Sequence, residues 1–190
     1  LSKGLANDLQ TLVRRFNITP FMLCHAALSL LVAKYSYEDD VVIGTPVANR
    51  NIKAVEPLIG FFVNTLVLRS DTTNRAVAEY FEHIRTVNLA ALEHQDVPFE
   101  QVVDRCCAAR STQYTPLFQI MLNMNNTDGA ELTLPGLEVE SLPVVAASSK
   151  YDLEFSVQLH DENSVLTLQF DATLFEIQSM EAMLRHYESV

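Results

Sequence analysis

The spacing of hydrophobic residues divides this chain into helices and strands. Apolar residues that recur every three or four positions predict helices, at residues 5–16, 20–35, 74–93, 98–107 and 177–187. Runs of β-branched and aromatic residues between polar turns predict strands, at residues 41–47, 61–69, 116–125, 137–144, 151–160 and 165–171. This mixture predicts an α/β (α+β) fold, a two-layer sandwich in which helices pack on a mixed sheet.

Five of these elements have a predicted place in the fold. The helix at residues 20–35 has Thr19 at its N-cap and Pro20 at its first helical position. It is apolar almost all round, which predicts a central, buried helix. The 61–69 strand is apolar on both faces, which predicts an interior strand covered on both sides. Residues 151–160 alternate cleanly and turn into 165–171, which predicts a hairpin. The 137–144 strand is expected at an edge.

Asn64 and Thr65 interrupt the apolar 61–69 strand. A buried amide costs roughly 1–3 kcal/mol unless it is hydrogen-bonded, so Asn64 needs partners if it is buried. One interpretation is a structural hydrogen bond to a neighbouring loop. The other is that this strand lines a cavity or tunnel. The pattern itself favours neither.

Composition narrows the possible partners and the setting. The 190 residues suit one domain, and no apolar run is long enough to span a bilayer. The formal net charge of −11 argues against nucleic acid and anionic membranes, which need basic patches. Three cysteines with neither zinc spacing nor a disulfide pattern favour a reduced, cytoplasmic setting. The chain starts without a signal sequence or an initiator Met, so we expect a domain from a longer protein.

A histidine and two carboxylates lie close together in "HQDVPFE", residues 94–100. They could form an acid–base or metal site, but the rules for helix ends also account for them. His94 suits the last turn of one helix, and Asp96 is a plausible N-cap for the next. Pro98 and Glu100 suit a first turn, and Phe99 would pack inward. We therefore interpret the stretch as structural and assign neither a catalytic nor a metal-binding residue.

Three stretches resemble, in order and spacing, late signature motifs of nonribosomal peptide synthetase condensation domains. They are "IGFFVNTLVLR" (59–69), "HQDVPFE" (94–100) and "RSTQYTPLFQ" (110–119). The last departs from the family pattern, because Ser111, Tyr114 and Thr115 replace its Asp, Arg and Asn. The positions that match these motifs are Gly60, Phe62, Val63, Arg69, His94, Gln95, Asp96, Pro98, Phe99, Glu100, Arg110, Pro116 and Leu117.

The family's catalytic motif, H-H-x-x-x-D-G, does not occur in this chain. The resemblance therefore implies that residues 1–190 are the C-terminal lobe of a two-lobed domain of the chloramphenicol acetyltransferase-like type. Such a domain forms a peptide bond between donor and acceptor thioesters, which carrier proteins present on 4'-phosphopantetheine arms. A histidine of the N-terminal lobe acts on the acceptor amine. This lobe alone would be inactive and would bind no cofactor directly.

The resemblance also implies partners and surfaces. The partners would be the N-terminal lobe, the donor and acceptor peptidyl carrier proteins and an adjacent adenylation domain. It favours the tunnel interpretation of Asn64 and Thr65. Candidate carrier-docking cations are Arg50, Lys53, Arg14 and Arg15, for which an ordinary solvated surface is an equally good explanation. The alternatives are an epimerisation or cyclisation relative, and a non-catalytic module that docks carrier proteins.

Overall fold

The computed structural model describes residues 3–73, 75–106, 114–124, 136–137, 149–159 and 164–190. Pairs of helices are followed by two or three strands along the chain, and a single helix comes last, in the order that the sequence pattern predicts. The elements are α1 (Lys3–Phe16), α2 (Pro20–Ser36), β1 (Asp40–Val47), β2 (Asn64–Asp71), α3 (Val77–Glu93), α4 (Phe99–Cys106), β3 (Ile120–Met124), β4 (Leu153–Gln158), β5 (Val165–Phe170) and α5 (Ile177–Ser189).

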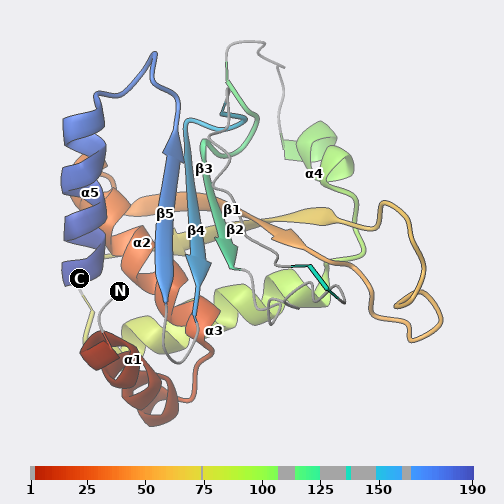
Figure 1. Cartoon of the computed structure of the whole chain (residues 1–190), viewed down its shortest axis with the longest axis horizontal. Helices are drawn as coiled ribbons and strands as arrows, with labels where there is room; N and C mark the ends of the chain where they lie inside the picture. The colour runs from red at the N-terminus through yellow and green to blue at the C-terminus, as the bar shows by residue number, and fades with distance from the viewer. Residues whose placement is uncertain (1–2, 74, 107–113, 125–135, 138–148, 160–163) are drawn as a thin grey trace.

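The five strands form one mixed sheet in the order β2-β1-β3-β4-β5 (Figure 1). β1 pairs antiparallel with β2, and β4 with β5, whereas β3 lies parallel to both of its neighbours. The β4–β5 pairing, with Leu153 opposite Phe170, confirms the predicted hairpin. The α/β fold with helices packed on a mixed sheet is also confirmed.

Helices α2 and α5 pack on one face of this sheet and bury the main core. Leu28 of α2 and Met183 of α5 share a cluster with Ile43 of β1 and Phe155 of β4. The Thr19 hydroxyl caps α2 by accepting a hydrogen bond from the Met22 backbone N–H at 3.2 Å. The prediction of a central, buried second helix is therefore confirmed.

A second apolar cluster joins α1, α2 and α3. Its buried members are Ile18, Met22, Leu23, Ala26, Tyr80, Phe81 and Ile84. Within the described ranges, no single helix has the length and apolarity needed to cross a membrane. A pair formed by Asp8–Phe16 and Pro20–Ser36 passes that test of length and composition, but it is bent by 100°.

The prediction of an interior strand at 61–69 is wrong in two respects. The strand runs from Asn64 to Asp71, and it lies at the end of the strand order. Its buried residues alternate with less buried ones, and the Arg69 side chain is exposed. The apolar residues that suggested two covered faces, such as Phe61 and Val63, belong instead to an exposed loop.

Other predicted boundaries also shift. β3 begins at Ile120 rather than at residue 116. The residues just before it do not continue the strand, and they place the Phe118 ring against Gly44 of β1. α4 begins at Phe99, one residue later than predicted. Most of the predicted 137–144 edge strand lies outside the described residues.

Candidate functional site

The Asn64 side chain connects the first residue of β2 to the α3–α4 connection. Its Nδ2 donates to the carbonyl oxygens of Gln95 at 2.7 Å and Val97 at 2.8 Å. Its Oδ1 accepts a hydrogen bond from the backbone N–H of Phe99 at 3.1 Å. Two of the three motifs are therefore joined by one side chain. Asn64 is half-buried, and its amide makes the loop hydrogen bonds that the structural interpretation required.

These bonds explain how the connection between α3 and α4 is built. His94 is the C-cap of α3, and its N–H bonds to the Ala91 carbonyl at 3.2 Å, as a residue at a helix end should. Pro98 directly precedes α4, and its carbonyl accepts the first helical bond, from Gln101. The prediction that Asp96 caps α4 is wrong, because the cap position falls on Pro98 and Asn64 satisfies the first N–H. Glu100 lies in the first turn, as predicted.

A row of aromatic rings lies next to this connection. The Phe99 and Phe118 ring centroids are 5.7 Å apart, and those of Phe118 and Tyr151 are 5.6 Å apart. Ile43 points towards α2, so its neighbour Gly44 faces the opposite side of the sheet, where Phe118 lies. The aromatic row therefore occupies the face away from α2. Phe99, predicted to pack inward, is half-buried against Phe118.

An open hollow of about 510 Å³ lies beside the aromatic row. Thr65 of the first motif, Asp96 of the second and Phe118 of the third all line it. Asn64 and Glu100 also contribute to its wall, so it has an aromatic part and a polar part. The three motifs, far apart in sequence, thus meet around one hollow. Another hollow, about 370 Å³ and mostly apolar, is bordered by α1, α2, α3 and α5 and by residues of β4 and β5, and no motif residue lines it.

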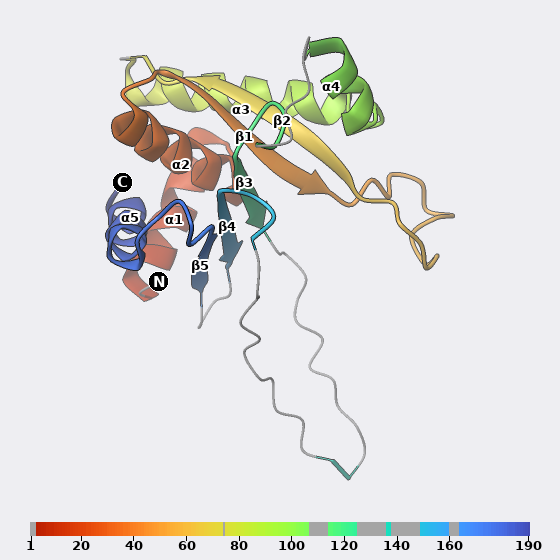
Figure 2. The same ribbon diagram turned by 90° about the horizontal axis from the view of Figure 1, so that it is seen from above.

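The loop between β1 and β2 projects from the body of the molecule (Figure 2). Arg50 organises it from inside: Nη1 donates to the carbonyl oxygens of Val55 at 2.6 Å, Glu56 at 3.1 Å and Leu58 at 2.8 Å. The same guanidinium lies over the Phe62 ring, 4.4 Å from its centroid. The Arg50 guanidinium therefore makes these contacts within its own loop and stabilises the fold of that loop.

The outer surface of this loop is apolar. Its exposed large side chains are Ile52, Leu58, Ile59, Phe61 and Val63. Lys53, the other cation predicted for docking in this loop, is also exposed. Such a group of exposed apolar side chains is typical of a surface that another protein or domain covers. We refer to Ile52, Leu58, Ile59, Phe61 and Val63 as the apolar tip.

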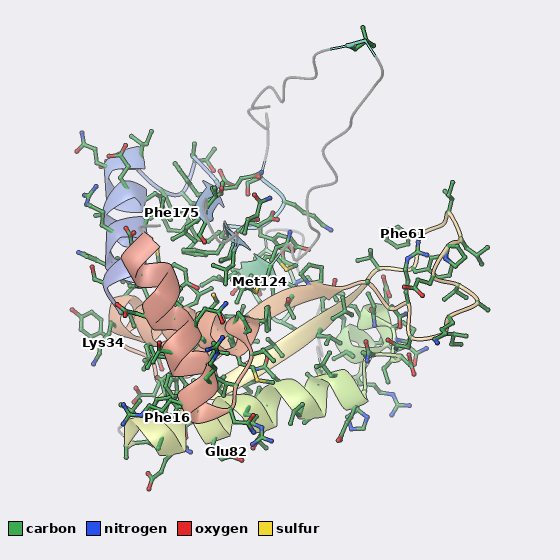
Figure 3. The ribbon with its side chains drawn as sticks, turned by 60° about the horizontal axis from the view of Figure 1, so that its bottom comes forward. Phe16, Lys34, Phe61, Glu82, Met124 and Phe175 are labelled. Atoms are coloured by element: carbon green, nitrogen blue, oxygen red, sulfur yellow. The ribbon has the colours of Figure 1, made fainter. Side chains whose placement is uncertain are left out.

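The other predicted residues lie apart from the hollow. Arg14 and Arg15 are exposed in the last turn of α1, at the opposite end of the molecule from the apolar tip, as the labelled Phe16 and Phe61 show (Figure 3). Arg69 pairs with Asp40 across β1 and β2, with Nη2 and Oδ2 2.7 Å apart. Both partners are largely exposed, which is typical of pairs that contribute little stability.

The structure describes only residues 114–119 of the third motif. Arg110 lies outside the described residues, whereas Pro116 and Leu117 are half-buried beside Phe118. Sequence reasoning did not identify Phe118, Gly44, Lys150 and Tyr151 as site residues. Phe118 directly follows the motif's Pro-Leu pair, which was the available signal for it. Within the described residues, no group of three or more His, Cys, Asp or Glu side chains is placed to hold a metal ion.

Comparison with known proteins gives one consistent result. The profile of the family described as "Condensation domain" matches residues 1–190. Malpinin synthetase of Mortierella alpina is 41% identical over 178 residues, which are 93% of this chain and 2% of that protein. The solved four-domain nonribosomal peptide synthetase holo-AB3403 superposes with a TM-score of 0.90 at 25% identity, over 99% of this chain and 16% of that one.

A second solved structure covers a larger share of its own chain. The X-domain from teicoplanin biosynthesis matches all of this chain and 45% of its own, with a TM-score of 0.87 at 25% identity. That X-domain has also been solved in a complex with OxyB. This chain therefore spans a few per cent of the curated relatives and less than half of the X-domain chain.

Proposed function

Because this chain belongs to the condensation-domain family of nonribosomal peptide synthetases, we propose that it is the C-terminal lobe of a peptide-bond-forming domain. In the proposed reaction, the acceptor amine attacks the carbonyl carbon of the donor thioester. The C–N bond forms, the C–S bond breaks, the amine loses a proton, and the donor's thiol is released. The observation that carries this proposal is the hollow at which the three family motifs meet.

The catalytic histidine would come from the other lobe. The H-H-x-x-x-D-G motif is missing from this sequence, and this chain matches 45% of the X-domain chain, which leaves room for a second lobe of similar size. None of the five histidines of this chain occurs in such a motif. This lobe would then contribute a wall of the active-site tunnel and part of the carrier-docking surface, but no catalytic group.

The lining of the hollow suits a 4'-phosphopantetheine arm. Such an arm carries amide groups and a dimethyl-bearing carbon, so it needs both hydrogen-bond partners and apolar contacts. Thr65 and Thr115 offer hydroxyl groups, and Phe118 offers an apolar ring face. The carrier would deliver the arm, and no cofactor would be held by this lobe itself.

The apolar tip is the proposed contact with the N-terminal lobe. It carries exposed apolar side chains on a projecting loop, and it needs a partner to remove them from water. Carrier proteins are usually acidic, so their docking would use cations that remain exposed. Arg50 no longer suits that role, whereas Lys53, Arg14 and Arg15 remain exposed candidates. Neighbouring carrier and adenylation domains would complete the assembly.

Reconstitution of the two lobes tests the proposal. The isolated chain, incubated with donor- and acceptor-loaded carrier proteins, should yield no amide detectable by mass spectrometry of the released product. Addition of the missing lobe should restore amide formation. Amide formation by the isolated chain would disprove the proposed division of labour, and a failure of the intact domain to form amide would disprove the proposed reaction.

The same assay separates the alternative reactions. A peptide that keeps the configuration of the donor residue indicates condensation. Inversion at that residue without a new amide indicates epimerisation, and loss of one further water indicates cyclisation. Binding without catalysis is a second candidate, which the X-domain favours because it shares this fold and forms a complex with OxyB. It would be supported if the intact domain bound carrier proteins but catalysed none of these changes.

A further inference from the structure

The α3–α4 connection contains backbone groups that its own helices do not satisfy. The N–H of Phe99 is the first of α4, and the first four N–H groups of a helix have no partner within it. The carbonyls of Gln95 and Val97 lie between the two helices. Asn64 satisfies all three groups from 31 to 35 residues away in sequence. We call residues 95–99 the clamped loop.

A carboxamide is well suited to this task. It offers two donors and one acceptor on a short, planar group, whereas a carboxylate offers acceptors alone and a hydroxyl offers one donor. Both Nδ2 hydrogens of Asn64 are used by the loop carbonyls. The amide therefore has no remaining donor for a substrate, although its side chain borders the hollow.

The clamped loop, in turn, forms one wall of the hollow. Asp96, Pro98 and Phe99 line it, and Glu100 follows directly. The Phe99 ring also contacts Phe118, so the position of the loop determines where the aromatic row lies. A shift of the loop would move both the polar and the apolar parts of this wall.

We propose that Asn64 is a positioning residue, which fixes the wall that holds the carrier-bound substrate by clamping residues 95–99. This inference rests on the proposed function. It differs from the expectation that Asn64 contacts the substrate itself, because its effect passes through the loop. A misplacement of about 1 Å can cost roughly 100-fold in rate even when the altered residue does not touch the reacting atoms.

Asn64→Asp tests the proposal in the intact synthetase that contains this chain. The carboxylate keeps the size of the amide but loses both donors and faces two carbonyl oxygens. Hydrogen exchange of peptides that cover the clamped loop should become faster. Turnover per folded molecule should fall about 10- to 100-fold. The loss should appear in kcat, because the carrier proteins bind outer surfaces that Asn64 does not touch, so their KM should change by less than about twofold.

Asn88→Asp is the matched control. The amide of Asn88 also uses both hydrogens, which reach the Ile84 carbonyl at 2.7 Å and the Nδ1 atom of His25 at 2.9 Å. Asn88 is buried between α2 and α3 and does not line the hollow. Its variant should lose stability but keep wild-type turnover per folded molecule. If Asn64→Asp does not fold, Asn64→Ser, which retains one donor, should show the same loss in kcat to a smaller degree.

Three results would overturn the proposal. The clamp does not exist if exchange in residues 95–99 is unchanged in Asn64→Asp. Asn64 is merely structural if the loop is released but turnover stays at the wild-type value, or if Asn88→Asp lowers turnover per folded molecule equally. An intact wild-type protein that forms no amide would instead refute the proposed function. In that case the exchange measurement would still report on the clamp, so the two failures are distinguishable.

Discussion

The Phe118 ring lies directly over the backbone of Gly44. A Cβ atom added to Gly44 would lie 2.2 Å from Cε2 of Phe118, well inside van der Waals contact. Gly44 is therefore required for close approach rather than for an unusual backbone conformation. Phe118 is almost fully buried and also touches Phe99 and Tyr151, so the aromatic row depends on the missing side chain of Gly44.

Gly44→Ala should force the Phe118 ring out of its place. Overpacking of this kind costs about 1–3 kcal/mol, and we expect a loss of that size in the free energy of unfolding, measured with urea. The double variant Gly44→Ala/Phe118→Leu should lose less than the sum of the two single changes, because the smaller side chain relieves the clash. Full additivity would show that the two residues do not compete for the same space.

Arg50→Ala should loosen the loop between β1 and β2. It removes the three hydrogen bonds to loop carbonyls and the cation–π contact with Phe62. Hydrogen exchange of residues 52–62 should become faster. Lys53→Ala is the matched control, since it removes a neighbouring exposed cation and should leave the exchange unchanged. Equal exchange in both variants would show that Arg50 does not organise the loop.

Ile59→Ser should affect the assembly of the domain and not the folding of this lobe. Ile59 is fully exposed, so the change should alter the free energy of unfolding of this chain by less than about 0.5 kcal/mol. In the intact domain, it should weaken the proposed contact between the apolar tip and the N-terminal lobe, and so lower the thermal midpoint of unfolding. Leu174→Ser, an exposed change outside the apolar tip, is the control. Equal midpoints for the two variants would argue against the tip as the lobe contact.

The sequence predicted those elements whose signals are local. The second helix has Thr19 at its N-cap, Pro20 at its first position and apolar residues almost all round, and these features act within a few positions. The alternation in β4 likewise reports directly on one buried and one less buried face. In contrast, Phe61 and Val63 have strand-like side chains but lie in a loop. Both side chains are exposed there, and the spacing of apolar residues cannot distinguish an exposed apolar side chain from a buried one.

The site could be predicted by its motifs but not by its contacts. The stretch "HQDVPFE" suggested a local cap by Asp96, because nearby residues are the usual partners at helix ends. The actual partner of the Phe99 N–H is Asn64, 35 residues away. The contact of Gly44 with Phe118 likewise depends on the pairing of β1 with β3. Such partners are determined by tertiary packing, and the spacing of residues within a short stretch of sequence does not indicate them.

His25 is a titratable group in the apolar core. It is fully buried between α2 and α3, and its Nδ1 lies 2.9 Å from Nδ2 of Asn88. Among the described residues, its Nε2 has no hydrogen-bond partner. Burial, followed by the charge of His83, lowers the pKa of His25 from 6.5 to about 4. The folded protein therefore holds this ring neutral under conditions in which an unfolded chain would protonate it.

The free energy of unfolding should consequently fall as the solution becomes more acidic. Between pH 6.5 and about 4, the unfolded state binds a proton at His25 that the folded state does not, so acid favours unfolding. The contribution of His25 to the free energy of unfolding is about 3 kcal/mol. It is fully present above pH 6.5 and is lost progressively as the pH falls to about 4. Urea unfolding at several pH values should show a flatter profile for His25→Gln in this window. The same measurement on His186→Gln, a change at an exposed histidine outside the core, serves as the control. Identical slopes in all three proteins would mean that His25 does not govern this acid sensitivity.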